Sequence, residues 1–363
     1  FYADAHGFEI RNSDIDYDAR NRDIDLPYQE VNHFKVVSNT ELLFADHKMD
    51  IDLSYQNNLR REYAEPTEHG YRPLPPNTLE REFNKDVFSA NVVMNHFFDD
   101  RHAMTSGVNL EYQNNRIGGW GFIIPAFRRY TAGAFIFDRY RISETLSATA
   151  GVRFDFGQID LEPYYDWYQS PVFDSEGNMV GEEFIQRSPA LSKDFTALTG
   201  SVGINYSATW FTGKLNLGRS FRLPDARELG ADGVNYHLYR QEVGDSTLTA
   251  ETAWQADLSM DFGFEKTILT INGFYSWFPN YIYLNPTSEF SDETGLQIFR
   301  FVQNEVVRWG GEVEIDQKFT DQFSLNLAGE YVFSEQISGE KKGFGLAFSP
   351  PPSVMAGLTW SPE

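Results

Sequence analysis

Three segments of this 363-residue chain bring aromatic side chains close together, two of them with an arginine, and these side chains could bind a ligand. Aromatic rings stack on planar groups and attract cations, and guanidinium groups form paired hydrogen bonds with anions. Such segments suit planar, metal-chelating or anionic ligands. The candidates are Arg116, Trp120 and Phe122 in the first segment, Tyr164, Tyr165, Trp167 and Tyr168 in the second, and Tyr236, His237, Tyr239 and Arg240 in the third.

Residues for bond chemistry or for a resident metal are scarce. Cysteine is absent, which excludes thiolate ligands, thiol nucleophiles and disulfides. The histidines lack the paired spacing of metal ligands, although His69 or His237 could each ligate haem. The sequence DSEGN at Asp174–Asn178 gives an incomplete calcium pattern and reads better as a hairpin turn. No Ser-His-Asp arrangement follows from the spacing, so we expect no enzyme, no metal site and no cofactor.

The stretch Thr145–Phe156, TLSATAGVRFDF, indicates which elements position these segments. Apolar residues alternate with polar or small ones throughout, which places the two sets on opposite faces of a β-strand. The pattern recurs to give about 14 strands, and short turns alternate with long loops, as outer-membrane barrels require. The sequence therefore predicts an all-β fold, a transmembrane antiparallel up-and-down β-barrel of the outer-membrane type.

The candidate ligand residues fall in predicted long loops, at 115–128, 158–194 and 219–250. In an up-and-down barrel every second connection lies on the same side, so the long loops share the extracellular end. The same aromatic residues could instead form the extracellular aromatic girdle and pack the loops. Both interpretations remain open at this stage.

Charged residues alternate with apolar ones on several predicted strands. In Met49–Glu62, carboxylates and an arginine share one face, which suits a polar lumen where opposite charges pair along the wall. The predicted lumen-facing residues are Arg60, Glu62, Arg153, Asp155, Glu312 and Glu314.

Composition narrows the class of protein further. Mean hydropathy is -0.45, and no apolar run approaches the roughly 20 residues of a membrane helix. The aromatic share of 16% would supply the girdles of a barrel, and the net charge of -23 argues against nucleic acid as a partner. The first residues, FYADAHGFEI, lack the features of a signal peptide, so we expect a mature chain or part of a longer one.

Several segments, in this order and spacing, resemble the barrel of TonB-dependent outer-membrane transporters. FRLPDARELG and the segment after it resemble the family's FRxPxxxEL and LxxExxxxxxLG motifs, and Phe221, Arg222 and Pro224 are expected to shape the exit from strand to loop. The segments are DIDLPYQ (Asp23–Gln29), YQNNLRREY (Tyr55–Tyr63), GVNLEYQNN (Gly107–Asn115), AGVRFD (Ala150–Asp155), FRLPDARELG (Phe221–Gly230), GDSTLTAETAWQADLSM (Gly244–Met260), VQNEVVRWGGEVEI (Val302–Ile315) and SPPPSVMAGLTW (Ser349–Trp360).

Family members enclose an N-terminal plug domain in a barrel of about 22 strands. No plug, TonB box or closing aromatic strand is visible here, so the resemblance implies that residues 1–363 form a partial barrel lacking the plug and the first and last strands. The lumen-facing residues could then contact the plug. A complete plugless barrel of about 14 strands is the alternative, although an unpaired strand edge in lipid is costly.

The resemblance also implies a function in the bacterial outer membrane. This is TonB-dependent active uptake of a scarce nutrient, a ferric siderophore or other iron complex before haem or cobalamin. The implied partners are the TonB-ExbB-ExbD complex acting through the plug, a small-molecule metal chelate and outer-membrane lipid. The residues leave two alternatives open, a passive porin-like channel and a surface adhesin barrel.

Overall fold

The computed structural model describes residues 2–3, 9–10, 24–44, 46–67, 72–235, 238–347 and 349–362. Within these residues nearly all regular structure is β-strand, and no helix is long and apolar enough to span a membrane. The elements are β1 (Tyr2–Ala3), β2 (Glu9–Ile10), β3 (Tyr28–Phe44), β4 (His47–Tyr63), β5 (Leu79–Phe97), β6 (His102–Gly118), β7 (Phe127–Arg141), β8 (Leu146–Leu161), β9 (Tyr164–Phe173), β10 (Met179–Ser188), β11 (Leu191–Ser207), β12 (Phe211–Arg222), α1 (Ala226–Gly230), β13 (Asp232–Asn235), β14 (Arg240–Val243), β15 (Glu251–Gly263), β16 (Thr267–Phe290), β17 (Gln297–Lys318), β18 (Phe323–Gln336) and β19 (Ser353–Trp360).

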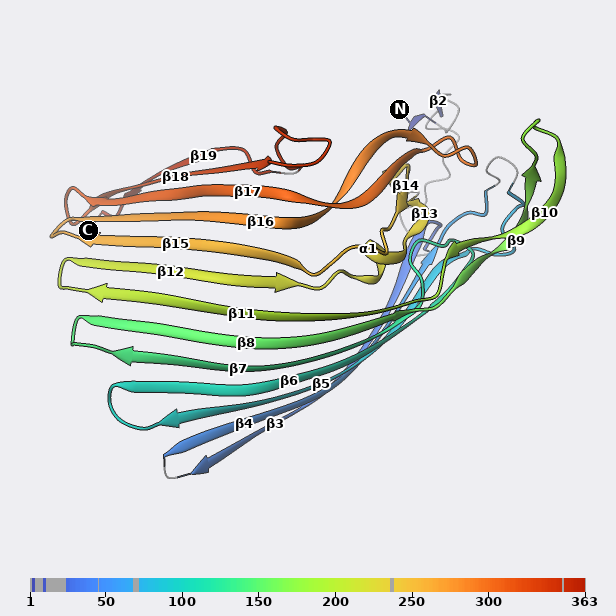
Figure 1. Ribbon diagram of the computed structural model, residues 1–363. Helices are drawn as coiled ribbons and strands as arrows, with labels where there is room; N and C mark the ends of the chain where they lie inside the picture. The colour runs from blue at the N-terminus through green and yellow to red at the C-terminus, as the bar shows by residue number, and fades with distance from the viewer. Residues whose placement is uncertain are drawn as a thin grey trace.

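Fifteen strands form one curved sheet (Figure 1). Its order is β13-β14-β17-β16-β15-β12-β11-β8-β7-β6-β5-β4-β3, and β18 and β19 continue from β17. The long strands pair antiparallel with their neighbours, whereas β14 pairs parallel with β17. The sheet is not closed, because β3 and β19 form two separate edges. This architecture confirms the predicted all-β, antiparallel up-and-down barrel and its approximate strand number.

The connections sort by length between the two ends of the sheet. The short turns, such as those that join β7 to β8 and β11 to β12, lie together at the left in Figure 1. The long connections lie at the other end, as the alternation in the sequence predicts.

Some segments predicted as loops contain strands. The segment 158–194 holds the β9–β10 hairpin, whose turn is the predicted Asp174–Asn178 turn, closed by a 2.9 Å hydrogen bond from the Asp174 amide to the Asn178 carbonyl. The β16 strand continues to Phe290 through a region predicted as loop. It accommodates Pro279 in an irregularity between Phe278 and Tyr281, where a missing backbone donor is tolerated.

The two faces of the sheet differ in chemistry. One face, here called the outer face, carries exposed apolar side chains such as Phe154, Leu198 and Leu217. The opposite, inner face is polar. There Arg153 pairs with Asp155 at 2.6 Å and donates a 2.6 Å hydrogen bond to Asn109 on β6. The register continues these two faces from strand to strand across the sheet, apart from irregularities in β4 and β16.

The largest buried cluster lies at the long-connection end, on the inner side of the sheet. There the connection between β12 and β15 folds inward and packs α1 against β8, β11, β16 and β17. A long loop was predicted for 219–250. The structure instead gives α1, β13 and β14, because Leu229 and Leu248 become almost fully buried. The cluster consists of Ile159, Leu161, Phe195, Ala226, Leu229, Leu248, Ile282 and Phe301.

Candidate ligand-binding site

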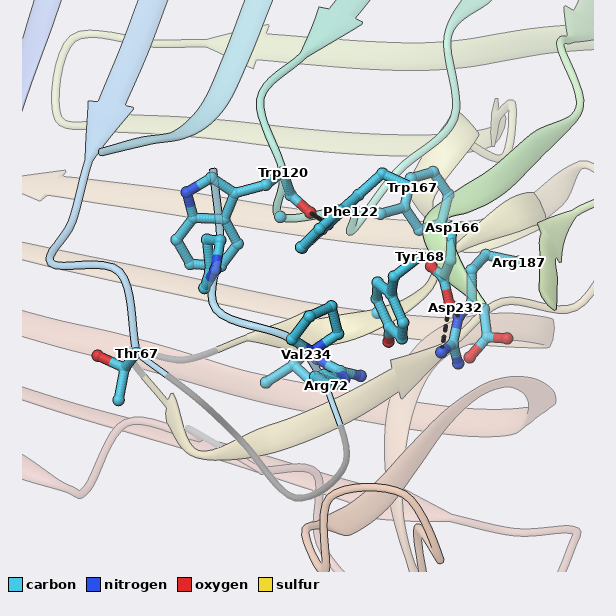
Figure 2. A pocket seen from close by; sticks show the side chains of 14 residues that line it. Thr67, Arg72, Trp120, Phe122, Asp166, Trp167, Tyr168, Arg187, Asp232 and Val234 are labelled. Carbon is cyan, nitrogen blue, oxygen red and sulfur yellow. Dashed lines mark hydrogen bonds and ion pairs between the residues drawn. The ribbon is translucent and has the colours of Figure 1, made fainter. Parts of the chain in front are cut away.

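Four long connections meet at the loop end of the sheet and line one pocket (Figure 2). They are the connections from β4 to β5, β6 to β7, β8 to β11 and β12 to β15. The empty space in and above the pocket is about 490 Å³. Its aromatic side chains are Trp120, Phe122, Trp167 and Tyr168, and its charged side chains are Arg72, Asp166, Arg187 and Asp232.

The aromatic residues are fixed by contacts with one another. The Trp167 indole nitrogen donates a 3.1 Å hydrogen bond to the Trp120 carbonyl, which ties β9 to the β6–β7 connection. The Phe122 ring stacks on Tyr164, with centroids 4.1 Å apart and planes 12° apart. Trp167 and Tyr168 pack edge to face at 5.2 Å. The rings are therefore held in place before any ligand arrives, which lowers the entropic cost of binding.

The charged side of the pocket is built around Glu293, in the β16–β17 connection. Its carboxylate accepts hydrogen bonds from Arg72 at 2.7 Å, from the Tyr168 hydroxyl at 2.6 Å and from Arg187 at 2.6 Å. Arg187 also donates to Asp166 at 2.7 Å. The side chains of Arg187, Asp166 and Glu293 are 8%, 8% and 9% exposed, so water screens these pairs little.

The network affects the pKa values of two carboxyl groups in and beside the pocket. Burial alone would raise the pKa of Glu293, but hydrogen bonds from Arg72 and Tyr168 and the charge of Arg187 hold it at about 2. Burial raises the pKa of the neighbouring Asp232 carboxyl, against the charge of Arg187 and a 2.8 Å hydrogen bond from Gln241. The pocket thus combines one firmly ionised carboxylate with one that protonates more readily.

The floor of the pocket is the β13–β14 hairpin, docked on the inner face. Arg81 of β5 donates a 2.8 Å hydrogen bond to the Val234 carbonyl. Glu242, which is fully buried, receives hydrogen bonds from Arg227, Arg240 and Asn235. These contacts hold both strands of the hairpin.

Gly233 allows this hairpin to approach the β6–β7 connection. A Cβ atom at Gly233 would lie 2.1 Å from the Phe122 carbonyl oxygen. We therefore expect Gly233→Val to displace the hairpin, expose Trp120 and destabilise the site by about 1–3 kcal/mol. Tryptophan fluorescence and limited proteolysis of the purified protein would measure this. Gly181→Val, on β10 with nothing within 4 Å of its Cβ position, is the control and should change neither.

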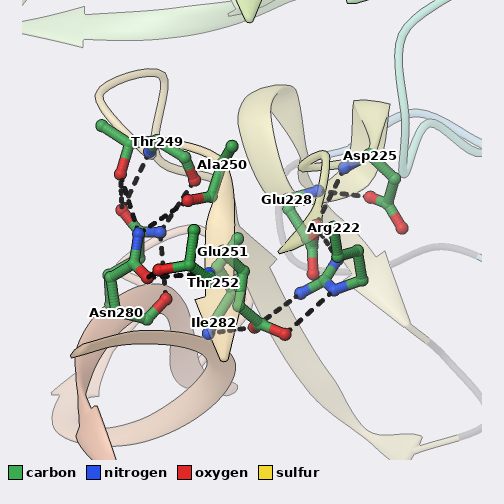
Figure 3. A network of polar contacts seen from close by, with 10 residues as sticks. Arg222, Asp225, Glu228, Thr249, Ala250, Glu251, Thr252, Asn280 and Ile282 are labelled. Carbon is green, nitrogen blue, oxygen red and sulfur yellow. Dashed lines mark hydrogen bonds and ion pairs between the residues drawn. The ribbon is translucent and has the colours of Figure 1, made fainter. Parts of the chain in front are cut away.

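The FRLPDARELG segment anchors the same connection to the wall (Figure 3). Arg222, at the end of β12, pairs with Glu228 at 2.8 Å and with Glu251 of β15 at 3.1 Å. Asp225 and Glu228 form a capping box that starts α1. The Glu251 carboxylate also accepts a 2.6 Å hydrogen bond from the Ile282 amide of β16. The segment therefore does more than end a strand, because its contacts join β12, β15, β16 and α1.

The structure brings some of the predicted ligand residues together. Trp120, Phe122, Trp167 and Tyr168 line the pocket, and Tyr164 supports Phe122 from behind. These five come from two of the three predicted segments.

The other predicted ligand residues lie elsewhere. Arg116 is within β6 and pairs with Asp86 at 2.8 Å on the outer face, because β6 extends to Gly118 beyond the predicted loop boundary. Tyr165 is exposed and does not line the pocket, because it is on the opposite side of β9 from the buried Asp166 and Tyr168. Tyr239 is 78% exposed, whereas Arg240 is occupied by Glu242 and by the Phe299 ring, 4.8 Å away. The third-segment candidates Tyr236 and His237, like His69, lie outside the described residues.

The register places the predicted lumen residues on the inner face. Arg60 pairs with Glu62, and Arg153 with Asp155. Two more are on β17: Glu312 lies opposite Glu330 of β18, and Glu314 accepts a 2.8 Å hydrogen bond from Asn326. The pairing along the wall that the alternation suggested is therefore present for these two arginines.

Several charged residues that line the pocket or support its lining were not singled out from the sequence. They are isolated charged residues in long connections, so neither spacing nor a motif marks them before the loops are assembled. They are Arg72, Asp166, Arg187, Asp232 and Glu293. In the described part of the chain, no three His, Asp or Glu side chains gather to hold a metal ion.

These features define a class of protein, a curved outer-membrane-type barrel wall whose long loops form a pocket over its inner face. The chain belongs to the TonB dependent receptor-like, beta-barrel family, whose model matches residues 2–363. It is therefore a protein of the bacterial outer membrane, as predicted, and its family is one of receptors and not of enzymes.

Solved structures support the same fold. The copper transporter OprC is 14% identical with a TM-score of 0.69, over 92% of this chain and 51% of that one. The Serratia marcescens hemophore receptor HasR, solved with its hemophore HasA and heme, is 13% identical with a TM-score of 0.63, over 91% and 56%. The FrpB iron transporter of Neisseria meningitidis is 11% identical with a TM-score of 0.61, over 92% and 49%. The chain spans about half the length of these proteins.

Proposed function

We propose that this chain is the barrel wall of a TonB-dependent receptor that takes up a scarce nutrient as a metal chelate, a ferric siderophore or other iron complex first. The observation that carries the proposal is the pocket at the loop end, where fixed aromatic rings lie beside Arg72 and Arg187. The rings complement the planar groups of such chelates. The ion pairs of Arg72 and Arg187 with Glu293 and Asp166 hold the β9–β10 hairpin that presents two of these rings. The copper, haem and iron cargoes named for the similar structures are all metal species.

Energised uptake would draw on the TonB-ExbB-ExbD complex through a plug domain, and this too is part of the proposal. The polar inner face, with Glu312 and Arg153, offers charged groups on which such a domain could rest. Cells that express the full protein should accumulate radio-iron-labelled chelate, and accumulation should stop when TonB is deleted or the proton gradient is collapsed. Uptake that continues unchanged would favour the passive channel, and surface binding without any uptake would favour the adhesin.

We expect the aromatic side of the pocket to dominate ligand affinity. Trp120→Ala or Phe122→Ala should raise the dissociation constant for the bound chelate about tenfold, because each loses roughly 1–2 kcal/mol of ring contact. Tryptophan fluorescence titration of the purified full-length protein would measure it. Ferric catecholate, ferric hydroxamate, haem and cupric ion are the ligands to compare.

Tyr165→Ala is the matched control, since Tyr165 is an aromatic residue of β9, at the same end of the sheet, that does not line the pocket. It should bind like the unmodified protein. Equal affinities for Trp120→Ala and Tyr165→Ala would remove the pocket from the proposal. If none of the four ligands binds, the proposal that the ligand is a metal chelate is wrong.

A further inference from the structure

The outer face carries an arginine among apolar side chains. On β12, Leu215, Leu217 and Arg219 alternate on that face, and both leucines are exposed. The Arg219 guanidinium donates a 2.5 Å hydrogen bond to the Leu198 carbonyl and lies 5.8 Å from the Trp254 ring centroid. Among the described residues no carboxylate pairs with it, in contrast to Arg116 and its partner Asp86 on the same face. Arg219 therefore has a full positive charge that no acidic side chain balances.

Arg219 lies in a row of paired residues that crosses four strands. Gly200 of β11 is its register partner on one side, and Trp254 of β15 is its partner on the other. Trp277 of β16 lies opposite Trp254. Gly200 has no side chain to fill the surface beside the arginine, whereas the two indole rings project from the sheet. The result is an open depression in the outer face, with Leu198, Val202 and Leu217 along its floor and sides.

The position of this row along the strands determines which part of the membrane surrounds it. Arg219 is three residues from Arg222, where β12 ends and a long connection begins, so the row lies near the long-connection edge of the apolar band. Tryptophans in outer-membrane barrels gather where acyl chains meet headgroups. An arginine facing apolar surroundings is costly unless its head reaches an anion at that boundary. The charge, the indoles and the apolar floor thus match the phosphate, the headgroup and an acyl chain of one phosphorylated lipid.

We propose that Arg219, Trp254 and Trp277 form a binding site for a phosphorylated lipid of the leaflet on the long-loop side. The guanidinium binds the lipid phosphate with paired hydrogen bonds, and the indoles flank the headgroup. One acyl chain lies in the depression over Gly200, against Leu198 and Val202. The site faces away from the pocket at the loop end and does not depend on the cargo of the receptor.

Native mass spectrometry of the full-length protein in detergent would test the site. The probe is lipid A with its phosphates, and the comparisons are dephosphorylated lipid A and inorganic phosphate alone. The unmodified protein should retain lipid A, while Arg219→Gln should weaken retention about tenfold, the loss expected for one charged hydrogen-bonded contact. Arg219→Lys keeps the charge and should retain an intermediate fraction.

Arg116→Gln is the matched control, because it removes the same charge from the same face at a position that already has a carboxylate partner. It should retain lipid A like the unmodified protein. The proposal would be overturned if Arg219→Gln retained as much lipid A as Arg116→Gln, if dephosphorylated lipid A bound equally well, or if inorganic phosphate displaced the lipid. If Arg219→Gln does not fold, retention by Arg219→Lys equal to that of the unmodified protein would contradict the expected paired hydrogen bonds.

Discussion

Glu293→Gln is expected to release the β9–β10 hairpin from the pocket. The variant keeps the shape of the side chain but removes the charge that holds Arg72 and Arg187. Arg187 would retain Asp166, yet the buried Arg187 and the partly buried Arg72 would together face one carboxylate less. Breaking a buried ion pair from one side costs about 3–5 kcal/mol. We expect this cost to exceed the stability that the backbone hydrogen bonds between β9 and β10 give the hairpin. The hairpin should therefore open locally while the barrel wall stays intact.

Hydrogen exchange resolved along the chain would measure the opening. The amides of β9 and β10 should exchange much faster in Glu293→Gln, while those of β7 and β8 should keep their protection. Glu162→Gln is the control, since Glu162 pairs with Arg128 at 3.5 Å with both side chains more than half exposed. Such a pair is worth about 0–1 kcal/mol, and its loss should leave exchange unchanged. Equal exchange in both variants would show that the Glu293 network does not hold the hairpin.

The same carboxylate predicts how pH acts on the pocket. The folded-state pKa of Glu293 is about 2, below the value of about 4.3 for an unperturbed glutamate. Its contribution to stability is therefore complete above about pH 4.3 and is lost as the pH falls toward 2. The hairpin of the unmodified protein should stay protected at pH 5 and open between about pH 4 and pH 2. The Glu293→Gln hairpin should be open throughout and show no such transition.

The barrel wall could be predicted from the sequence because each strand carries its own evidence. Strands such as β8 alternate apolar and polar residues along their length, and a shift by one residue would reverse both faces. The loop end gave no such local signal. The α1 helix has only five residues, and its burial depends on Leu229 meeting Ile159 and Ile282, which come from distant strands. Elements that are stabilised mainly by tertiary packing do not appear in a periodicity analysis.

Part of the candidate site could likewise be predicted from the sequence, and part could not. Its aromatic half was predicted because Trp120 with Phe122, and Trp167 with Tyr168, form two short aromatic clusters in the sequence. Its charged half was not, because Arg72 and Glu293 are 221 residues apart and meet only through the curvature of the sheet. Alternation within β9 also separates Tyr165 from Tyr168, a distinction that segment composition alone does not make.

The FRLPDARELG segment shows an intermediate case. The sequence marked Phe221, Arg222 and Pro224 as a strand exit, and β12 does end at Arg222. The partners of Arg222 could not be read from the segment alone, because Glu251 follows 29 residues later. Local motifs therefore located the junction, whereas its energetic role depends on contacts between strands.

We expect Glu251→Ala to destabilise this junction by about 3 kcal/mol. The Glu251 side chain is 11% exposed and accepts from Arg222 and from the Ile282 amide. Its removal leaves the Ile282 amide buried without its acceptor and Arg222 with Glu228 as its one remaining carboxylate among the described residues. Because β12, β15 and β16 all meet here, the loss should spread into the wall and lower the stability of the whole sheet.

Guanidinium unfolding of the full-length protein in detergent, followed by tryptophan fluorescence, would measure this effect as a lower midpoint. Glu289→Ala is the control, since Glu289 pairs with Arg300 at 2.6 Å while its side chain is 57% exposed. Water replaces an exposed carboxylate, so that change should cost less than about 1 kcal/mol. Glu251→Gln should fall between the two variants, because its amide oxygen can still accept from Ile282 but carries no charge for Arg222. If all three variants unfolded at one midpoint, the junction would be a geometric consequence of the barrel wall and would not be what holds the loop end to it.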